Sequence, residues 1–226
     1  MAKVLRSGDT AERFVATALE LIAEHGGSGQ VNLRQVAKRL GCAHTNLYNY
    51  YASYPELLWE AFRRTLVVYR DWLVRDLDDS LSPDAYLRRV LENLATFPQA
   101  HPGLYRFIAS DRLPTEDIPR DVLEAVGAMK RWLAAACAAG SATVIRSADA
   151  TTIADIVLAY VDGETLNLIN ERLVPGEDIA ARIVDNALRL HRLLVLDARS
   201  ADPADEAHPA RTHYPTLDIP IDHRGG

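Results

Sequence analysis

The sequence predicts an all-α fold. Apolar residues recur at helical spacing along nearly the whole 226-residue chain, and no segment shows the sustained alternation of a half-buried strand. Glycines that tolerate a left-handed conformation separate the periodic segments, most clearly at Gly26, Gly27 and Gly41. With 48% hydrophobic and 25% charged residues, the chain has enough apolar material for one large core or two modest ones.

Composition and motifs argue against several other classes of protein. The longest apolar run, 132–139, is far shorter than a membrane span, and no apolar signal segment follows the N-terminus, so we expect a cytoplasmic protein with no membrane partner. Cys42 and Cys137 lie in no metal-ligand pattern, so we expect no metal site, disulfide or cofactor. No nucleophile with a base, carboxylate pair or phosphate loop can be placed, and the chain is therefore not expected to be an enzyme.

The first three predicted helices form a recognisable group. The first spans about 9–25. The second begins after Asn32, a favourable N-cap with Gln35 in the capping-box position, and it ends at Gly41. A short third helix follows at about 44–50. A helix, a tight glycine turn and a second short helix match the DNA-binding helix-turn-helix, although an ordinary corner between two core helices remains the alternative.

The charge distribution favours DNA as the partner of this group. Residues 1–55 hold six Lys/Arg and four Asp/Glu, a net charge of +2, which leaves −8 for the rest of a chain whose total is −6. Residues 31–53 contain three basic residues and no acidic one, which suits a confined contact with a polyanion. Polar side chains on this group can reach phosphates or base edges. The candidate DNA-binding residues are Asn32, Arg34, Lys38, His44, Thr45, Asn46, Tyr48, Asn49 and Tyr54.

Residues 14–62, which include "VNLRQVAKRLGCAHTNLYNYYASYPELL", resemble the N-terminal domain of the TetR family of transcriptional regulators. The matching positions are Val36-Ala37 for the family's Ile-Ala, Gly41 for its turn glycine, Leu47-Tyr48 for its Leu-Tyr, Tyr51 for its core Phe, and Leu57-Leu58 for the end of the motif. Ala43 replaces a capping Ser and Tyr54 replaces a phosphate-binding Lys. The resemblance implies a homodimer that binds double-stranded operator DNA and a small-molecule effector.

The chain is expected to have three parts. The resemblance implies a helix-turn-helix domain at 1–53 and an effector-binding and dimerisation domain at 54–199, and the prolines of 200–226 predict a non-helical tail. A helix from 54 to about 78 links the first two parts. The next helix starts at Pro83 and is expected to stop at "PQAHPG". A short helix at about 104–110 follows, and after 112–119 comes a longer one that reaches about residue 139.

The second part contains aromatic residues among small ones, a mixture that suits an apolar ligand cavity. The pocket candidates are Tyr86, Phe97, Tyr105, Phe107, Met129, Trp132, Tyr160, Glu164 and Asn167. Ordinary core packing of the aromatic residues and a solvated helix face for the polar ones are the alternatives.

The last two predicted helices, about 149–173 and 177–198, carry apolar stripes too wide for one-sided packing, which predicts pairing with a second copy of the chain. The candidate interface residues are Val157, Val161, Leu168, Ile183, Leu190 and Leu194. The main hypothesis is a homodimeric, ligand-responsive transcriptional regulator, specifically a repressor of a palindromic operator with a largely apolar effector. The alternative is a helical small-molecule-binding or interaction protein whose DNA-binding head has weakened or lost operator binding.

Overall fold

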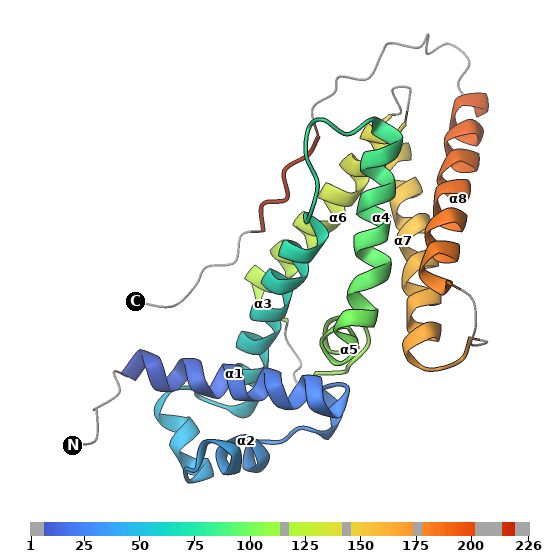
Figure 1. Ribbon diagram of the computed structural model, residues 1–226. Coiled ribbons are helices and arrows are strands. Elements are labelled where there is room, and N and C mark those ends of the chain that lie inside the picture. Colours follow the sequence, from blue (N-terminus) through green and yellow to red (C-terminus); the bar gives the residue numbers. More distant parts are fainter. Residues whose placement is uncertain (1–6, 114–117, 142–145, 174–177, 202–213, 220–226) are drawn as a thin grey trace. The chain divides into compact units, whose positions relative to one another are not determined.

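The computed structural model describes residues 7–113, 118–141, 146–173, 178–201 and 214–219. Every regular element among these residues is helical, which confirms the predicted fold class (Figure 1). In chain order the elements are α1 (Ser7–His25), the 3-10 helix η1 (Ser28–Gln30), α2 (Leu33–Leu40), the 3-10 helix η2 (His44–Asn49), α3 (Tyr54–Leu73), α4 (Pro83–Ala100), α5 (Pro102–Ala109), α6 (Arg120–Ala139), α7 (Ser147–Ile169) and α8 (Ile179–Ala201). Within the described residues, no helix is both long and apolar enough to cross a membrane.

The chain divides into two compact units. The first unit comprises Met1–Tyr69, Ala100–Leu123 and Pro220–Gly226, and the second comprises Arg70–Gln99 and Glu124–Ile219. Helices α3, α4 and α6 therefore each contribute residues to both units. These units are defined by packing and differ from the ranges 1–53, 54–199 and 200–226, whose division by function stays a prediction.

The first unit packs α1 against α2 and α5. Its core contains Phe14, Ile22 and Phe107, each with no exposed surface. Gly103 on α5 lies so close to α1 that a Cβ atom there would stand 2.6 Å from the carbonyl oxygen of Ile22. The two helices can approach this closely only because position 103 has no side chain.

Side chains from the end of α5 hold the loop between α1 and α2. Asp111 accepts hydrogen bonds from the backbone nitrogen of Ser28 and, at 2.8 Å, from the Ser28 hydroxyl. Arg106 donates to the carbonyl oxygen of Gly26 at 3.2 Å. Gly26 and Gly27 both have positive φ, 73° and 146°. The loop that leads into α2 is therefore fixed by contacts to residues at least 80 positions away in sequence.

The second unit contains α7 and α8, which lie side by side (Figure 1). It also contains the C-terminal end of α3, where the buried amide of Asn93 on α4 donates to the carbonyl oxygens of Leu73 at 3.0 Å and Arg75 at 2.8 Å. These are carbonyl groups that the end of a helix leaves without a helical partner. The predicted end of this helix near 78 is too late, because the chain leaves the helix after Leu73 and turns at Asp76 with φ 58°.

The next helix stops within "PQAHPG", as predicted, although not at the first proline of that stretch. Helix α4 includes Pro98 and continues to Ala100. A proline costs a helix one hydrogen bond, and near the C-terminal end few further bonds depend on it. The break comes instead at His101, whose φ of −136° is typical of a residue that precedes a proline, and Pro102 then begins α5.

Part of the C-terminal tail packs against the second unit. Residues 214–219 form no helix, as predicted for the tail, whereas α8 extends to Ala201, slightly beyond the predicted end. Tyr214, Leu217 and Ile219 are buried. Three of these six residues thus belong to the core of the second unit.

Candidate functional site

The start of α2 is fixed by a reciprocal pair of hydrogen bonds. The Asn32 side chain accepts from the backbone nitrogen of Gln35 at 3.1 Å, and the Gln35 side chain accepts from the backbone nitrogen of Asn32 at 2.8 Å. This is the predicted capping box. Because the side-chain oxygen of Asn32 is engaged, only its amide NH₂ group remains to contact a phosphate.

The turn after α2 has the geometry that the sequence predicts. Gly41 adopts φ 69° and ψ 31°, the left-handed conformation, and Cys42 donates its backbone N–H to the carbonyl oxygen of Ala37 at 3.0 Å. Val36, Ala37 and Leu47 are buried and form the small core between the two helices. The turn therefore ends α2 and brings the next helix back against it.

The second helix of this motif differs in type from the predicted one. It is the 3-10 helix η2, and Ala43 before it provides no side-chain cap. A capping hydroxyl or carboxamide at that position would stabilise an α-helical first turn, and alanine cannot supply one. The predicted location is confirmed, whereas the helix is tighter and less regular than an α-helix.

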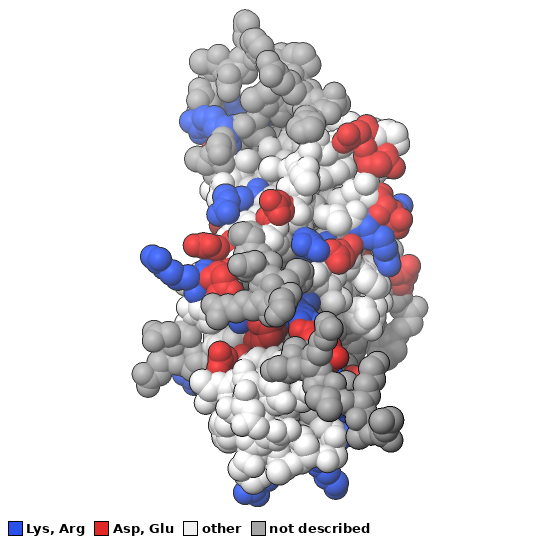
Figure 2. Space-filling model, turned by 90° about the vertical axis from the view of Figure 1, so that its left-hand side faces the viewer, with Lys and Arg blue, Asp and Glu red and all other residues white. Residues whose placement is uncertain are grey.

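Most of the candidate DNA-binding side chains are on the surface of this motif. The exposed ones are Asn32, Arg34, Lys38, His44, Thr45, Tyr48 and Asn49. Tyr48 is 56% exposed, a large value for a tyrosine. Asn46 is half-buried and accepts a hydrogen bond from Asn49 at 2.9 Å, so these two amides form one polar pair. In Figure 2, where this motif lies towards the bottom of the view, the surface there is largely uncharged with Lys and Arg at its lower edge.

The basic residues of α2 are not equivalent. Arg39 forms a two-point ion pair with Glu24 on α1, with nitrogen–oxygen distances of 2.7 and 3.0 Å. Arg34 and Lys38 have no ion pair with any described residue, and no acidic residue lies within 31–53. The positive charge that a polyanion would meet on α2 therefore comes from Arg34 and Lys38.

That Tyr54 contacts DNA stays a prediction, although the structure gives its hydroxyl a partner within the motif. The Tyr54 hydroxyl donates to the carbonyl oxygen of Val31 at 3.0 Å, and burial raises its pKa to about 12. Tyr51 acts similarly, since its hydroxyl donates to the carbonyl oxygen of Ala11 at 3.2 Å. Both tyrosines hold the motif together internally, and a phosphate contact at position 54 would require the hydroxyl to leave its partner.

The start of α3 contains a cap that sequence reasoning missed. The Ser53 hydroxyl accepts from the backbone nitrogen of Glu56 at 3.2 Å, and Glu56 in turn accepts from the backbone nitrogen of Ala52 at 2.5 Å. Ser followed three residues later by Glu is the sequence signal of a capping box. This cap fixes the point where the chain leaves the helix-turn-helix.

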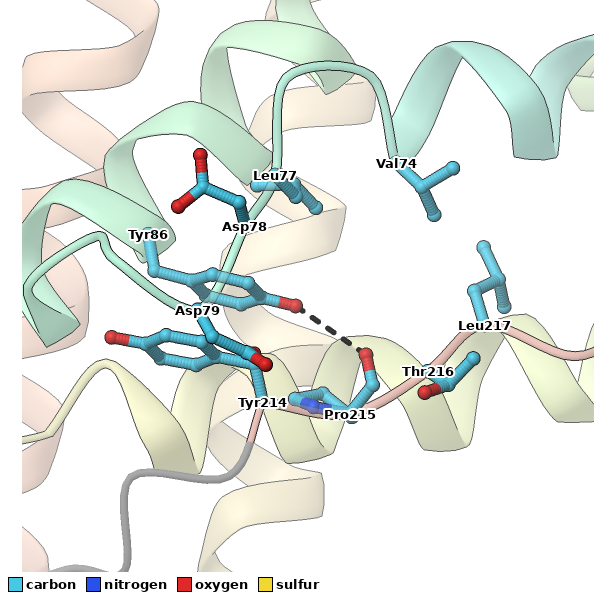
Figure 3. Close-up of a pocket in the computed structure, with 9 residues that line it drawn as sticks. All are labelled: Val74, Leu77, Asp78, Asp79, Tyr86, Tyr214, Pro215, Thr216 and Leu217. Atoms are coloured by element: carbon cyan, nitrogen blue, oxygen red, sulfur yellow. Dashed lines mark hydrogen bonds between the residues drawn. The ribbon is translucent and has the colours of Figure 1, made fainter.

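The second unit contains an aromatic cluster that involves the C-terminal segment. The rings of Tyr86 and Tyr214 are stacked, with centroids 3.9 Å apart and an angle of 3° between their planes. The carbonyl oxygen of Pro215 accepts a hydrogen bond from the indole nitrogen of Trp132 at 3.0 Å. It also accepts one from the Tyr86 hydroxyl at 3.5 Å, which Figure 3 shows. Burial raises the pKa of Tyr86 to about 12.

A cavity of about 320 Å³ borders this cluster. Figure 3 shows that its walls come from the end of α3 and the following loop, from α4 and from the C-terminal segment. The lining residues are Val74, Leu77, Asp78, Asp79, Tyr86, Tyr214, Pro215, Thr216 and Leu217. The volume lies at the lower end of the range for small-molecule sites.

The structure separates the predicted pocket residues into groups. Tyr86 lines the cavity, and Trp132 binds the segment that forms one wall of it. Tyr105 and Phe107 pack edge-on against Tyr69 and Phe62 in the first unit. They fill the core of that unit, in agreement with the ordinary-packing alternative.

The remaining candidates do not line this cavity either. Phe97 is fully buried and packs edge-on against Trp72. Met129, Tyr160, Glu164 and Asn167 are half-buried, and Glu164 lies 3.7 Å from Arg182 on α8. The aromatic contribution of Tyr214 was missed because it comes from a Pro-rich tail. The alternation of apolar residues at 217 and 219 was the available signal for a packed segment.

The predicted interface residues on α7 and α8 also divide into two groups. Val157, Val161 and Ile183 are at most 1% exposed within one chain, so their assignment to a free surface is wrong. Leu168, Leu190 and Leu194 are half-buried. Three other large apolar residues of these two helices are more exposed: Ile156 at 41%, Leu193 at 56% and Leu196 at 57%. Helical spacing marked the stripe, but it could not tell which part the chain itself covers.

The arrangement of α1, α2 and η2 places the protein in the class of helical proteins with an N-terminal helix-turn-helix. No protein-family model and no curated protein sequence matches the chain. The chain does match solved structures. A TetR-family transcriptional regulator from Streptomyces coelicolor has a TM-score of 0.68 at 15% identity, covering 86% of this chain and 84% of that chain.

Two further structures agree. A TetR-like transcriptional regulator from Rhodococcus sp. RHA1 has a TM-score of 0.59 at 18% identity, covering 86% of this chain and 99% of that one. A single-residue variant of TetR from Acinetobacter baumannii AYE, in complex with minocycline, has a TM-score of 0.55 at 21% identity, covering 82% of this chain and 96% of that one. At these identities the likeness establishes the fold, which is that of the TetR-family transcriptional regulators.

Proposed function

We propose that the chain is a transcriptional repressor that binds a palindromic DNA operator as a homodimer and responds to a small, largely apolar effector. The observation that carries this proposal is the exposed, acid-free surface of α2 and η2. It combines two cations that pair with no described residue, Arg34 and Lys38, with short polar side chains on a capped and glycine-terminated helix pair. Cations supply sequence-independent attraction to phosphates, and neutral polar groups read base edges.

Dimerisation is supported by the exposed apolar residues of the last two helices. Leu193 and Leu196 lie three positions apart on α8, so they share one face of that helix. Exposed leucines at this spacing favour burial against an identical surface. A two-fold dimer would present two copies of η2 to successive major grooves if they are about 34–36 Å apart.

An effector response is supported by the cavity beside Tyr86 and by the fold. The cavity is lined by apolar and aromatic side chains with a few polar groups, as small-molecule sites are. A regulator with the same fold has been solved with minocycline bound. We infer that a ligand in the second unit changes operator affinity to the extent that it binds one arrangement of the dimer better than another.

The DNA-binding proposal is tested by selecting sites from a random duplex library. We expect an enriched palindrome. Arg34→Ala and Lys38→Ala should weaken binding to all sequences and lower the salt dependence by about one ion each. His44→Ala and Asn46→Ala should instead change base preference at particular positions.

Arg39→Ala is the matched control, since that cation lies on the same helix but is paired with Glu24. It should reduce the salt dependence less than the other two substitutions do. A selection that enriches no palindrome would remove the repressor proposal.

One observation favours the alternative, a small-molecule-binding protein whose DNA-binding head is weakened. The position at which the TetR-family resemblance leads one to expect a phosphate-binding lysine holds Tyr54, whose hydroxyl is engaged with Val31. Tyr54→Lys separates the two functions. If the chain is a repressor, this substitution should tighten its binding to the operator. If the DNA-binding head has lost operator binding, the substitution should create no preference for any DNA sequence.

A further inference from the structure

The C-terminal segment Tyr214–Ile219 occupies the aromatic site of the second unit in the way that a bound ligand would. Its phenol ring stacks on Tyr86 at 3.9 Å, and one carbonyl oxygen, that of Pro215, accepts from both Trp132 and Tyr86. A flat ring held face to face and an acceptor held by two donors fix both the position and the orientation of the segment.

The side chains of the segment alternate between buried and exposed. Tyr214, Leu217 and Ile219 are 6%, 8% and 4% exposed, whereas Thr216, at the edge of the cavity, and Asp218 are exposed. The site therefore recognises an aromatic ring, a nearby acceptor and branched aliphatic groups. Figure 3 shows the Tyr86 and Tyr214 rings lying parallel, with the carbonyl group of Pro215 directed at the Tyr86 hydroxyl.

The segment is held by side-chain contacts. Besides those to Pro215, the Tyr214 hydroxyl donates to the carbonyl oxygen of Leu81. Within the described part of the chain, no backbone–backbone hydrogen bond joins residues 214–219 to another element. A segment without a hydrogen-bonded ladder can leave its site while the helices stay intact, because few cooperative contacts are lost with it.

We propose that Tyr86 and Trp132 form a binding site for small molecules that join a flat aromatic ring to a hydrogen-bond acceptor, and that Tyr214–Ile219 is a built-in competitor for this site. The neighbouring cavity of about 320 Å³ gives such a ligand more room than the segment itself fills. The inference deepens the proposed function and rests on it only for its regulatory consequence: the effector of the repressor must displace the chain's own segment.

The competition has a predictable size. A tethered segment acts at an effective concentration on the order of millimolar, so a free ligand meets a site that is open for only a fraction of the time. The apparent dissociation constant of the ligand equals its intrinsic dissociation constant divided by that fraction. Weakening the segment should therefore tighten ligand binding although the segment is not part of the ligand.

The test uses the full chain and a fluorescently labelled peptide with the sequence HYPTLDIPI, residues 213–221. Fluorescence anisotropy should show at least about tenfold tighter peptide binding to Tyr214→Ala than to the wild type, because the tethered ring no longer stacks on Tyr86. N-acetyltyrosinamide, which carries the ring and the acceptor alone, should compete with the peptide. Adding Trp132→Phe to Tyr214→Ala should weaken peptide binding, since the donor to the Pro215 carbonyl is lost.

Asp218→Asn is the matched control, because this residue belongs to the same segment but is exposed and does not line the cavity. It should bind the peptide as weakly as the wild type does. Equal affinities of the wild type and Tyr214→Ala, or no binding to a Tyr214→Ala chain whose circular dichroism shows it to be folded, would overturn the proposal.

If Tyr214→Ala does not fold, methyl resonances of the wild type decide the question. Millimolar peptide should shift the Leu217 and Ile219 methyl signals towards those of free peptide, and unchanged signals would overturn the proposal. All of these measurements are made without DNA. If the DNA selection enriches no palindrome but the peptide replaces the chain's own segment, the repressor proposal is refuted and the proposal of a ligand site at Tyr86 and Trp132 stands.

Discussion

In the helix-turn-helix, the two ends of α2 are fixed by contacts between residues three to five positions apart, whereas the site around Tyr86 is held by residues more than 80 positions apart. The Asn32–Gln35 cap and the Gly41 turn are of the first kind. The hydrogen bonds from Trp132 and Tyr86 to Pro215 span 83 and 129 positions. We therefore expect the two regions to respond differently to mutation. Loss of a local cap should destabilise one end of one helix, whereas loss of a long-range contact should destabilise the core that several elements share.

The largest effect should come from the exposed leucines of α8. Leu196→Glu would place a charge opposite its own copy in the proposed dimer, and a buried unpaired charge costs about 3 kcal/mol or more, which corresponds to at least about a 100-fold weaker dimer. Sedimentation or light scattering over a concentration series measures this. Ile118→Glu, which changes an apolar residue that is 52% exposed and lies outside α7 and α8, should leave assembly intact. A wild type that is monomeric at micromolar concentration would refute the dimer.

Asn93→Leu tests the long-range side of the comparison next. The substitution keeps the approximate volume but leaves the carbonyl oxygens of Leu73 and Arg75 without their amide donor. Unsatisfied buried groups cost about 1–3 kcal/mol each, so we expect a loss of about 2–4 kcal/mol in the free energy of unfolding, measured by urea denaturation. Gln99→Leu is the control because the Gln99 side chain donates to Ala95 from an exposed position on the same helix. If both substitutions lower the free energy of unfolding equally, the burial of the Asn93 amide is not the reason for its contribution to stability.

Asn32→Ala tests the local side and should cost less. It removes the side-chain oxygen that accepts from Gln35, and loss of such a cap costs about 1 kcal/mol. Asn32→Gly should cost only a few tenths of a kcal/mol, because glycine is a tolerated N-cap. Thermal unfolding of the three proteins measures the order. A loss as large as that of Asn93→Leu would contradict the distinction between local and long-range contacts.

Alkaline pH should lower the free energy of unfolding through a buried tyrosine in each region. The contribution of each tyrosine should be smaller than the effects above. Burial raises the pKa values of Tyr54 and Tyr86 to about 12, whereas tyrosines in an unfolded chain ionise with a pKa near 10. The unfolded chain therefore loses these protons first, so this stabilisation is fully present below about pH 10 and is lost as the pH rises towards about 12. Tyr54→Phe and Tyr86→Phe should each reduce the fall in stability between about pH 9 and 11.5. An unchanged slope in both variants would exclude the buried tyrosines as its source.

Residues with strict local requirements were the most predictable parts of the molecule. Gly41 takes the left-handed conformation that its position after a short helix demands, and Asn32 forms the expected cap. The end of α3 was misplaced because its carbonyl groups are satisfied by Asn93, a partner 20 positions away that periodicity does not reveal. Tyr54 is a DNA-binding candidate because it takes the place of a phosphate-binding Lys in the TetR-family resemblance, yet its hydroxyl donates to the carbonyl oxygen of Val31.

The sequence by itself determined the all-α fold, the helix-turn-helix and its exposed polar face, since caps, glycine turns and amphipathic spacing act over a few residues. Only the tertiary structure decided which apolar residues of α7 and α8 remain exposed and which chain segment fills the site at Tyr86. Helical spacing shows that a stripe must be buried but does not identify its partner, because burial depends on every element that reaches the same surface. Tyr86 and Trp132 meet at Pro215 for that reason: the three residues lie far apart in the chain and come together only when it is folded.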